Sequence, residues 1–519
     1  MDRSATAALL GLIAIAACTA TKEAPPGLGK GVASGPVRAF SASPDGAWLA
    51  VLDGCRDAKS SVLPPQTANC TLRVVAAAGG AAKRVADAVT TLPHGLAWSR
   101  DGALAALASY DYASATGTLV LWRGGEPRTL ASGVSFHGFG PRGELGFVAG
   151  GRLSVLAPGE AEPRDVKGAD RVASFELSPS TSPCAGDAVR LAAREARAAG
   201  GRLLVAGCEL REARPLEAGQ VADYGFARAT PQLAYTVQQQ GGAELKLVRT
   251  EPAVATRVLG KGARTFAFSP SGKSVAFLCD AAPGKQGDLH VAAEGEKPAV
   301  LARDVGELAW ARDADRLAWL ERYDPRVRSG TLGVGGTGAA ARALAGNVSD
   351  FELSPDGRRV AFLQHTTRGG YSVDLGLAQL DGADAKPASV AQGAFGFAFS
   401  PDGRWLYYRT RCVRNAEACD LERVPAEGLA PGGKPESVAA GVKSFEFDPR
   451  DPDRLLVTWQ RMDAQALDVA VWQGGKTTSI DTYVSPGTAR FLGPDSRRVA
   501  YVVQQRKREG LYVAELPQR

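Results

Sequence analysis

One short pattern returns about every 45 residues along the chain, and it constrains the fold more than any other feature. Typical copies read FSASPDGAWLAVL from Phe40, FAFSPSGKSVAFL from Phe266 and FELSPDGRRVAFL from Phe351. Aligned on its turn, the pattern is anchored at Pro44, Arg100, Pro141, Pro179, Thr230, Pro270, Arg312, Pro355, Pro401, Pro449 and Pro494. A period near 45 residues is that of a four-stranded propeller blade.

Each copy predicts strands joined by a tight turn. Phe266 and Phe268 alternate with smaller residues, as in a strand with one buried face. Ser-Pro-Asp-Gly then forms a turn, because Pro presets φ and Asp-Gly supplies the bend. A second strand follows at once, as at 275–278, then a third, as at 245–248, and a short fourth. We expect an all-β protein, a β-propeller of about eleven four-stranded repeats.

Eleven repeats exceed the four to eight blades usual for one ring. We therefore expect two adjacent rings, with repeats one to five over residues 37–260 and repeats six to eleven over 261–519. The last repeat stops after its third strand, at 511–516. The segment 31–37 precedes the first repeat and can supply the missing outer strand, which would protect an exposed edge.

The cysteines indicate an oxidising compartment. Six of the eight fall into three local couples, each within one repeat: Cys55 with Cys70, Cys184 with Cys208, and Cys412 with Cys419. Two of these couples occupy equivalent positions, opening the loop between the second and third strands, which favours structural disulfides. Cys279 is left over as a buried thiol at a strand end.

The N-terminus predicts export. Residues 5–17 form an apolar run that is too short to span a bilayer but suits a signal peptide, so we assign residues 1–17 to it. The run ends in Ile-Ala-Ala-Cys18, which resembles the lipobox of bacterial lipoproteins. That resemblance implies lipidation of Cys18, and Thr19 after it implies the outer membrane. Residues 18–36 would then be a lipidated cysteine and flexible tether. The alternatives are an ordinary cleaved signal peptide or a buried N-terminal helix.

The FxFSPDGxxLAY pattern resembles the propeller repeats of the periplasmic TolB family and related surface lipoproteins. The resemblance covers nearly all of the mature chain, but only at the level of the repeat. It implies a propeller fold and, by analogy, a protein-binding role in the cell envelope. The chain departs from that family in its larger number of repeats, its lipobox and its lack of a recognisable helical N-terminal domain.

Catalytic signals are weak. There is no Gly-x-Ser-x-Gly elbow of a serine hydrolase. His94 and His137 precede the turns of the second and third repeats, so they can approach one channel mouth as a metal or polar-ligand site. The plainer interpretation, which we favour, is two partly exposed histidines near the blade rims. Glu176, Glu352 and Glu446 recur before turns, and we expect solvated or Arg-paired roles for them.

The charge balance argues against nucleic acid. Lys and Arg total 61 against 55 acidic residues, a formal charge of +6, which is too little for a basic stripe over so large a surface. We expect no cofactor and no metal. The sequence predicts a cell-envelope scaffold, anchored to the membrane by lipid, that binds a protein or glycan partner. The alternative is a propeller enzyme, a lyase or hydrolase acting on polysaccharide or peptide at the channel mouth.

Overall fold

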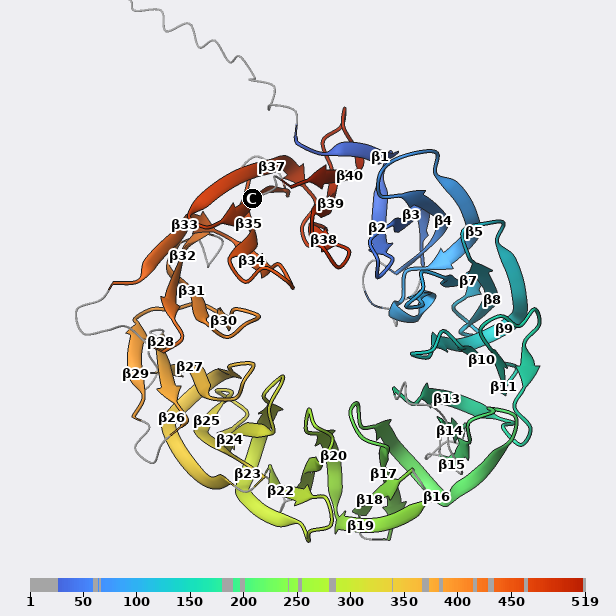
Figure 1. Ribbon diagram of the computed structural model, residues 1–519, viewed down its shortest axis with the longest axis horizontal. Helices are drawn as coiled ribbons and strands as arrows, with labels where there is room; N and C mark the ends of the chain where they lie inside the picture. The colour runs from blue at the N-terminus through green and yellow to red at the C-terminus, as the bar shows by residue number, and fades with distance from the viewer. Residues whose placement is uncertain are drawn as a thin grey trace, which may run out of the picture.

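The chain forms one closed ring of β-sheets (Figure 1). The computed structural model describes residues 27–516, except 59–63, 65–66, 180–189, 197–200, 241, 251–253, 280–285, 338, 366–372, 382–385, 414–417, 428–433 and 462–464. The expected signal peptide, Cys18 and Cys184 lie outside the described residues. Within the described part of the chain, no helix is both long enough and apolar enough to cross a bilayer.

The described strands group into eleven four-stranded antiparallel blades, which confirms the expected β-propeller. Blade 1 contains β2 (Val37–Ala42), β3 (Trp48–Asp57), β4 (Ala68–Ala76) and β5 (Lys83–Thr90). The short helix η1 (Pro93–Gly95) leads to blade 2, with β6 (Leu96–Trp98), β7 (Leu104–Asp111), β8 (Thr116–Trp122) and the first part of β9 (Arg128–Phe139). Blade 3 contains the rest of β9, β10 (Leu145–Ala149), β11 (Arg152–Leu156) and β12 (Arg164–Asp165). Blade 4 contains β13 (Val172–Leu177), β14 (Leu191–Glu195), β15 (Gly201–Ala206) and the first part of β16 (Ala213–Phe226).

Long strands again link the next four blades. Blade 5 contains the rest of β16, β17 (Gln232–Gln239), β18 (Gly242–Arg249) and β19 (Ala255–Lys261). Blade 6 contains β20 (Ala263–Phe268), β21 (Ser274–Cys279), β22 (Gly287–Ala293) and the first part of β23 (Ala299–Trp310). Blade 7 contains the rest of β23, β24 (Arg316–Asp324), β25 (Ser329–Gly336) and the first part of β26 (Ala339–Leu353). Blade 8 contains the rest of β26, β27 (Arg359–His365), β28 (Val373–Gln379) and β29 (Ala388–Ala391).

The last three blades complete the circle. Blade 9 contains β30 (Phe397–Phe399), β31 (Trp405–Val413), β32 (Ala418–Pro425) and β33 (Glu436–Val442). Blade 10 contains β34 (Ser444–Phe447), β35 (Arg454–Gln460), β36 (Leu467–Gln473) and β37 (Lys476–Val484). Blade 11 contains β38 (Arg490–Leu492), β39 (Arg498–Val503), β40 (Gly510–Glu515) and, as its outer strand, β1 (Lys30–Ser34).

The expectation of two adjacent rings is corrected by the structure, in which all blades belong to one ring (Figure 1). Blade 5 packs directly on blade 6 across residue 260, where Leu245 meets Val275 and Phe277 in one apolar cluster. Blade 11 packs on blade 1 in the same way, with Leu511 and Leu49 in a shared cluster. Because blades pack face to face everywhere, no boundary forms near residue 260.

Strand β1 closes the ring. β1 pairs antiparallel with β40, with Lys30 opposite Val513 and Ser34 opposite Gly510. The segment ahead of the first repeat thus supplies the missing outer strand of the last one, as expected. Part of the expected flexible tether at 18–36 is therefore a strand, because its pairing protects the free edge of β40.

The repeated Asp-Gly belongs to the turn. In blade 9 the Ser400 hydroxyl donates to Asp402 Oδ1 at 2.6 Å, and the same Oδ1 accepts the Arg404 amide at 3.1 Å. In blade 1 the equivalent hydrogen bond from the Ser43 hydroxyl, with that of the Ala47 amide, lowers the pKa of Asp45. This aspartate is thus engaged by the turn's own donors.

Two structural constraints require glycine in this turn, one on the backbone conformation and one on the space available for a side chain. Gly46 has φ +68°, and a Cβ there would lie 2.5 Å from the Gly493 nitrogen of blade 11. Only glycine meets both the left-handed backbone conformation and this close approach between neighbouring turns. The repeat motif therefore encodes blade-to-blade contact as well as the hairpin itself.

Strand order gives the ring two different faces. The turns between first and second strands, and between third and fourth, lie on one side, here called the AB face. The turns between second and third strands and the connections from one blade to the next lie on the other side, here called the BC face. This alternation follows from four antiparallel strands per blade.

Candidate functional site

Disulfides fasten loops of the BC face. Cys55 bonds to Cys70 between β3 and β4, across 15 residues, and Cys412 bonds to Cys419 between β31 and β32, across 7. Both therefore close a loop between second and third strands, at the equivalent positions expected from the sequence. Cys208 is also disulfide-bonded, and its expected partner Cys184 lies outside the described residues.

Cys279 ends β21. It is half-buried, so the expected buried thiol is more accessible than the sequence suggested. It is the last residue of the strand and packs at the edge of the apolar cluster between blades 5 and 6.

Three exposed apolar side chains lie on the BC face, and two others, Val258 and Val300, lie on the outer strands β19 and β23. Val327, Phe395 and Val413 are 62%, 52% and 57% exposed. Val327 lies in the turn between β24 and β25, Phe395 in the connection from blade 8 to blade 9, and Val413 at the end of β31. Because large apolar side chains exposed this far are disfavoured in water, the three on this face are candidate contacts for a partner.

The region around Phe395 is held in place. Its backbone N–H donates to the Arg409 carbonyl at 2.7 Å, and the Arg409 guanidinium lies 5.2 Å from the Phe395 ring centroid. Arg409 also donates to the Lys443 carbonyl of the next connection, and burial lowers its pKa. A half-buried cation against the ring fixes its orientation through the cation–π attraction.

The neighbouring hairpin is equally constrained. Arg411 pairs with Asp420 Oδ2 at 2.8 Å and with Glu422 Oε1 at 2.5 Å, next to the Cys412–Cys419 bridge. Charge-assisted hydrogen bonds from one guanidinium to two carboxylates bind both strands of the hairpin together. Val413 therefore lies at a strand end that a disulfide and two ion pairs join to the neighbouring strand.

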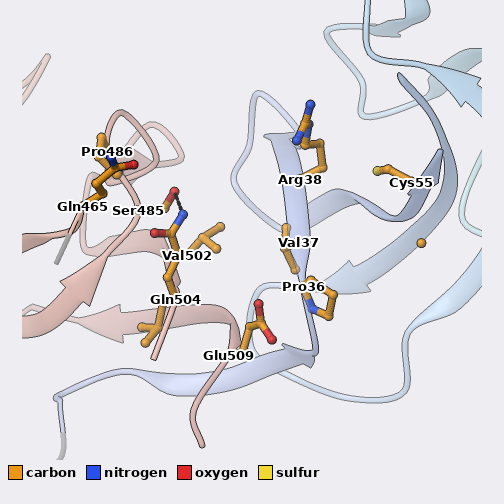
Figure 2. Close-up of a pocket in the computed structure, with 12 residues that line it drawn as sticks. Pro36, Val37, Arg38, Cys55, Gln465, Ser485, Pro486, Val502, Gln504 and Glu509 are labelled. Carbon is orange, nitrogen blue, oxygen red and sulfur yellow. Dashed lines mark hydrogen bonds between the residues drawn. The ribbon is translucent and has the colours of Figure 1, made fainter. Parts of the chain in front are cut away.

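A cavity of about 660 Å³, here called the seam cavity, lies where the ring closes, between blades 10, 11 and 1 (Figure 2). Pro36 and Val37 face Val502 and Gln504 across it. Its polar lining includes Arg38, Glu509 and Ser485, whose hydroxyl accepts a hydrogen bond from Gln504 Nε2 at 2.7 Å. Because its walls come from the BC ends of strands, the cavity belongs to the BC face. It joins apolar walls with one cationic and one anionic side chain, a combination suited to a polar ligand.

The structure brings His94 and His137 close together. His94 lies in η1 and its Nε2 is 3.2 Å from the Tyr110 hydroxyl, with its pKa lowered by burial. His137 lies on β9 beside the His94 backbone and is only 5% exposed. Burial lowers the pKa of His137 to about 4, so its imidazole is neutral at physiological pH.

The pair is part of a packed cluster between blades. Tyr110 stacks edge-on to Tyr112, whose hydroxyl donates to the Ala68 carbonyl at 2.8 Å. Neither histidine lines the seam cavity, and no three His, Cys, Asp or Glu side chains among the described residues form a metal-binding group. The expectation of two partly exposed histidines is corrected for His137, which is buried because β9 lies between two blades.

Two of the three recurring glutamates link neighbouring blades. Glu176 Oε1 accepts the Phe226 amide of blade 5 at 3.4 Å, and Glu352 is held in the same way by the Phe399 amide of blade 9. Burial raises the pKa of Glu352 to about 7, against the smaller opposing effect of that amide. Glu446 is exposed. The expected solvated or Arg-paired role is thus corrected for Glu176 and Glu352, because each inner strand offers backbone N–H groups to the blade before it.

Sequence reasoning missed the residues that distinguish the BC face. Phe395 and Val327 lie in irregular connections where no periodic pattern marks which side chains are exposed. Val413 belongs to the hairpin end that the cysteine couple closes, and this couple was the available signal. The seam cavity draws its walls from both ends of the chain, so no local pattern could reveal it.

Comparison with known proteins supports a β-propeller of the lipoprotein type. Residues 245–385 match the family described as lipoprotein LpqB β-propeller domain. A comparison with curated proteins gives no match.

Solved structures with a similar shape include three of low identity. The crystal structure of the eukaryotic initiation factor is 13% identical, with a TM-score of 0.40 over 78% of this chain and 88% of that one. Oligogalacturonate lyase in complex with manganese is 13% identical, with a TM-score of 0.32 over 65% of this chain and 99% of that one. A prolyl endopeptidase is 16% identical, with a TM-score of 0.32 over 58% of this chain and 50% of that one. At these values no function is carried over to this chain.

Proposed function

We propose that this chain is an exported lipoprotein of the bacterial cell envelope, anchored through Cys18 in the outer membrane, whose ring binds a protein or glycan partner through its BC face. The observation that carries the proposal is the exposure of Val327, Phe395 and Val413 on that one face. A binding surface gains affinity when exposed apolar groups are buried by the partner.

Rigidity of the face supports the same conclusion. The loop that presents Val413 is closed by a disulfide and by the Arg411 ion pairs, while Arg409 orients Phe395. Groups already held in their bound positions lose little conformational entropy on association. The seam cavity on the same face adds a recess with Arg38 and Glu509, which suits a polar extension of a protein or a sugar.

The test is crosslinking in cells followed by purification and mass spectrometry. We compare the native chain with Phe395→Ser combined with Val413→Ser, and with a control, Lys273→Glu, on the AB face, where Lys273 is exposed in the turn of blade 6. The expected result is a partner captured at constant ratio by the native chain and the control, and lost in the double variant.

Equal capture by all three chains would contradict a role for the BC face. A glycan partner is tested separately, by binding of soluble envelope glycan fragments to the same three purified chains. The native chain and the control should bind the fragments, and the double variant should not. The anchor has its own test, since the intact mass of the exported chain reveals diacylglycerol on Cys18, and Cys18→Ser releases the chain from membranes.

A further inference from the structure

The segment just after the expected tether is seated on a buried polar cluster. A Cβ on Gly27 would lie 2.1 Å from Asp481 Oδ2, and one on Gly29 would lie 2.0 Å from the Tyr501 hydroxyl. Neither glycine has a left-handed φ, so the close approach alone requires them. The Leu28 amide donates to the Ile480 carbonyl at 2.9 Å, which ties the segment to blade 10.

The carboxylate of Asp481 beneath this segment is held by several donors. Asp481 has a side chain that is 0% exposed, and its Oδ2 accepts hydrogen bonds from the Tyr501 hydroxyl at 2.9 Å and from Arg508 Nη2 at 2.6 Å. A buried carboxylate is stable only when donors satisfy it in this way. The contacts determine where the chain leaves the ring, at the rim between blades 10 and 11 (Figure 1).

This exit point restricts how far the ring can lie from a membrane. Eight residues, 19–26, separate Gly27 from Cys18. A fully extended chain spans at most about 3.5 Å per residue, so Gly27 lies within about 30 Å of a lipid on Cys18. A lipid on Cys18 would therefore keep the rim of blades 10 and 11 within reach of the bilayer surface.

The same rim carries exposed basic and apolar side chains. Arg506 and Lys507 are exposed in the turn between β39 and β40, and the following Arg508 is bound to Asp481 beside Gly27. Leu28 is 52% exposed. The one carboxylate of this turn, Glu509, lies next to Pro36 in the seam cavity (Figure 2).

We propose that Leu28, Arg506 and Lys507 form a second membrane contact that binds anionic lipid headgroups beside the lipid anchor. The inference rests on the anchor of the proposed function. Basic side chains near an anionic bilayer each add about 1 kcal/mol of attraction, and a single lipid chain holds a protein more firmly when a basic patch assists it. The turn joins the second and third strands of blade 11, so the contact lies at the BC edge of this rim, and the exposed apolar side chains of blades 7 to 9 are left to a partner.

The experiment uses the full chain with Cys18→Ser, which removes the lipid but keeps the rim. Its binding to vesicles of equal parts phosphatidylglycerol and phosphatidylcholine is compared with binding to pure phosphatidylcholine by co-sedimentation. Arg506→Glu with Lys507→Glu should weaken binding to the anionic vesicles by about tenfold or more. The matched control, Arg326→Glu with Arg328→Glu, changes two exposed arginines in a turn of blade 7, across the ring.

Binding that requires the anionic lipid, weakens with salt and is lost only in the rim variant supports the inference. Equal binding to both kinds of vesicle, or equal loss in the control, overturns it. Anionic glycan polymers that displace the chain from vesicles at matched charge concentration would also overturn it, by showing a preference for glycan over lipid. If mass spectrometry shows that the native chain carries no lipid, but its rim still binds anionic vesicles, the lipid anchor is refuted and the basic membrane contact is retained.

Discussion

Burial of His137 makes the stability of the ring depend on pH in a direction that can be worked out. An unfolded chain protonates this imidazole near pH 6.5, whereas the folded chain resists protonation until about pH 4. The unfolded state therefore binds more protons between these values. The stability that a neutral His137 allows is present above pH 6.5 and is lost as the pH falls toward 4.

The size of the effect follows from the shift. Each pKa unit corresponds to about 1.4 kcal/mol, so the full loss is about 3 kcal/mol below pH 4 and about 2 kcal/mol at pH 5. The substitution His137→Leu removes the titration while keeping an apolar side chain of similar volume at a buried position. From about pH 7.5 to about pH 5, the variant should therefore lose about 2 kcal/mol less stability than the native chain.

Glu352 acts in the opposite direction over nearly the same range. Its pKa is raised from 4.5 to about 7, so the folded chain binds more protons than the unfolded chain between these values. Its contribution is present below pH 4.5 and is lost as the pH rises through 7, by at most about 3 kcal/mol, since the side chain keeps some contact with water. These two contributions nearly cancel between pH 5 and 7, so removing either group should reveal the contribution of the other.

The assay is urea unfolding followed by tryptophan fluorescence, which the eight tryptophans provide. The free energy of unfolding is measured across this pH range for the native chain, His137→Leu and Glu352→Gln, with the slope against urea checked for constancy. Relative to the native chain, His137→Leu should lose less stability toward pH 5, and Glu352→Gln should lose less stability toward pH 7. Parallel profiles for all three chains would refute the reasoning, since they would mean that neither group is shifted by burial.

Three further predictions concern how the ring is held together. Gly29→Ala places a methyl group 2.0 Å from the Tyr501 hydroxyl and should destabilise the closing strand by about 1–3 kcal/mol, seen as faster hydrogen exchange in β1, and unchanged exchange would contradict the contact. Replacing Cys412 and Cys419 by Ser opens a loop of 7 residues and should cost about 2 kcal/mol by calorimetry, whereas an unaltered melting temperature would show that the ion pairs suffice. Arg423→Met removes a guanidinium that is 9% exposed and paired with two carboxylates that are 44% and 34% exposed, so we expect a loss of about 1–3 kcal/mol in urea unfolding, and a stability gain would refute it.

The sequence by itself determined the features that repeat locally. Strand positions, the Ser-Pro-Asp-Gly turns and the outer strand of the last blade follow from alternation, turn chemistry and an unpaired edge, all of which act over a few residues or a single pairing. The Cys55–Cys70 and Cys412–Cys419 bridges were equally accessible, because each closes a loop within one blade.

Only the tertiary structure decided how the repeats combine. Whether blades form one ring or two depends on small packing angles that add up around the circle, and no single repeat records their sum. The burial of His137 and the backbone contacts of Glu176 arise between blades, where each side chain meets a neighbour about 45 or more residues away. The exposed Phe395 and the seam cavity depend on which loops the ring brings to one face. The repeat pattern covers the strands and the turn between them, so it does not predict the arrangement of these loops.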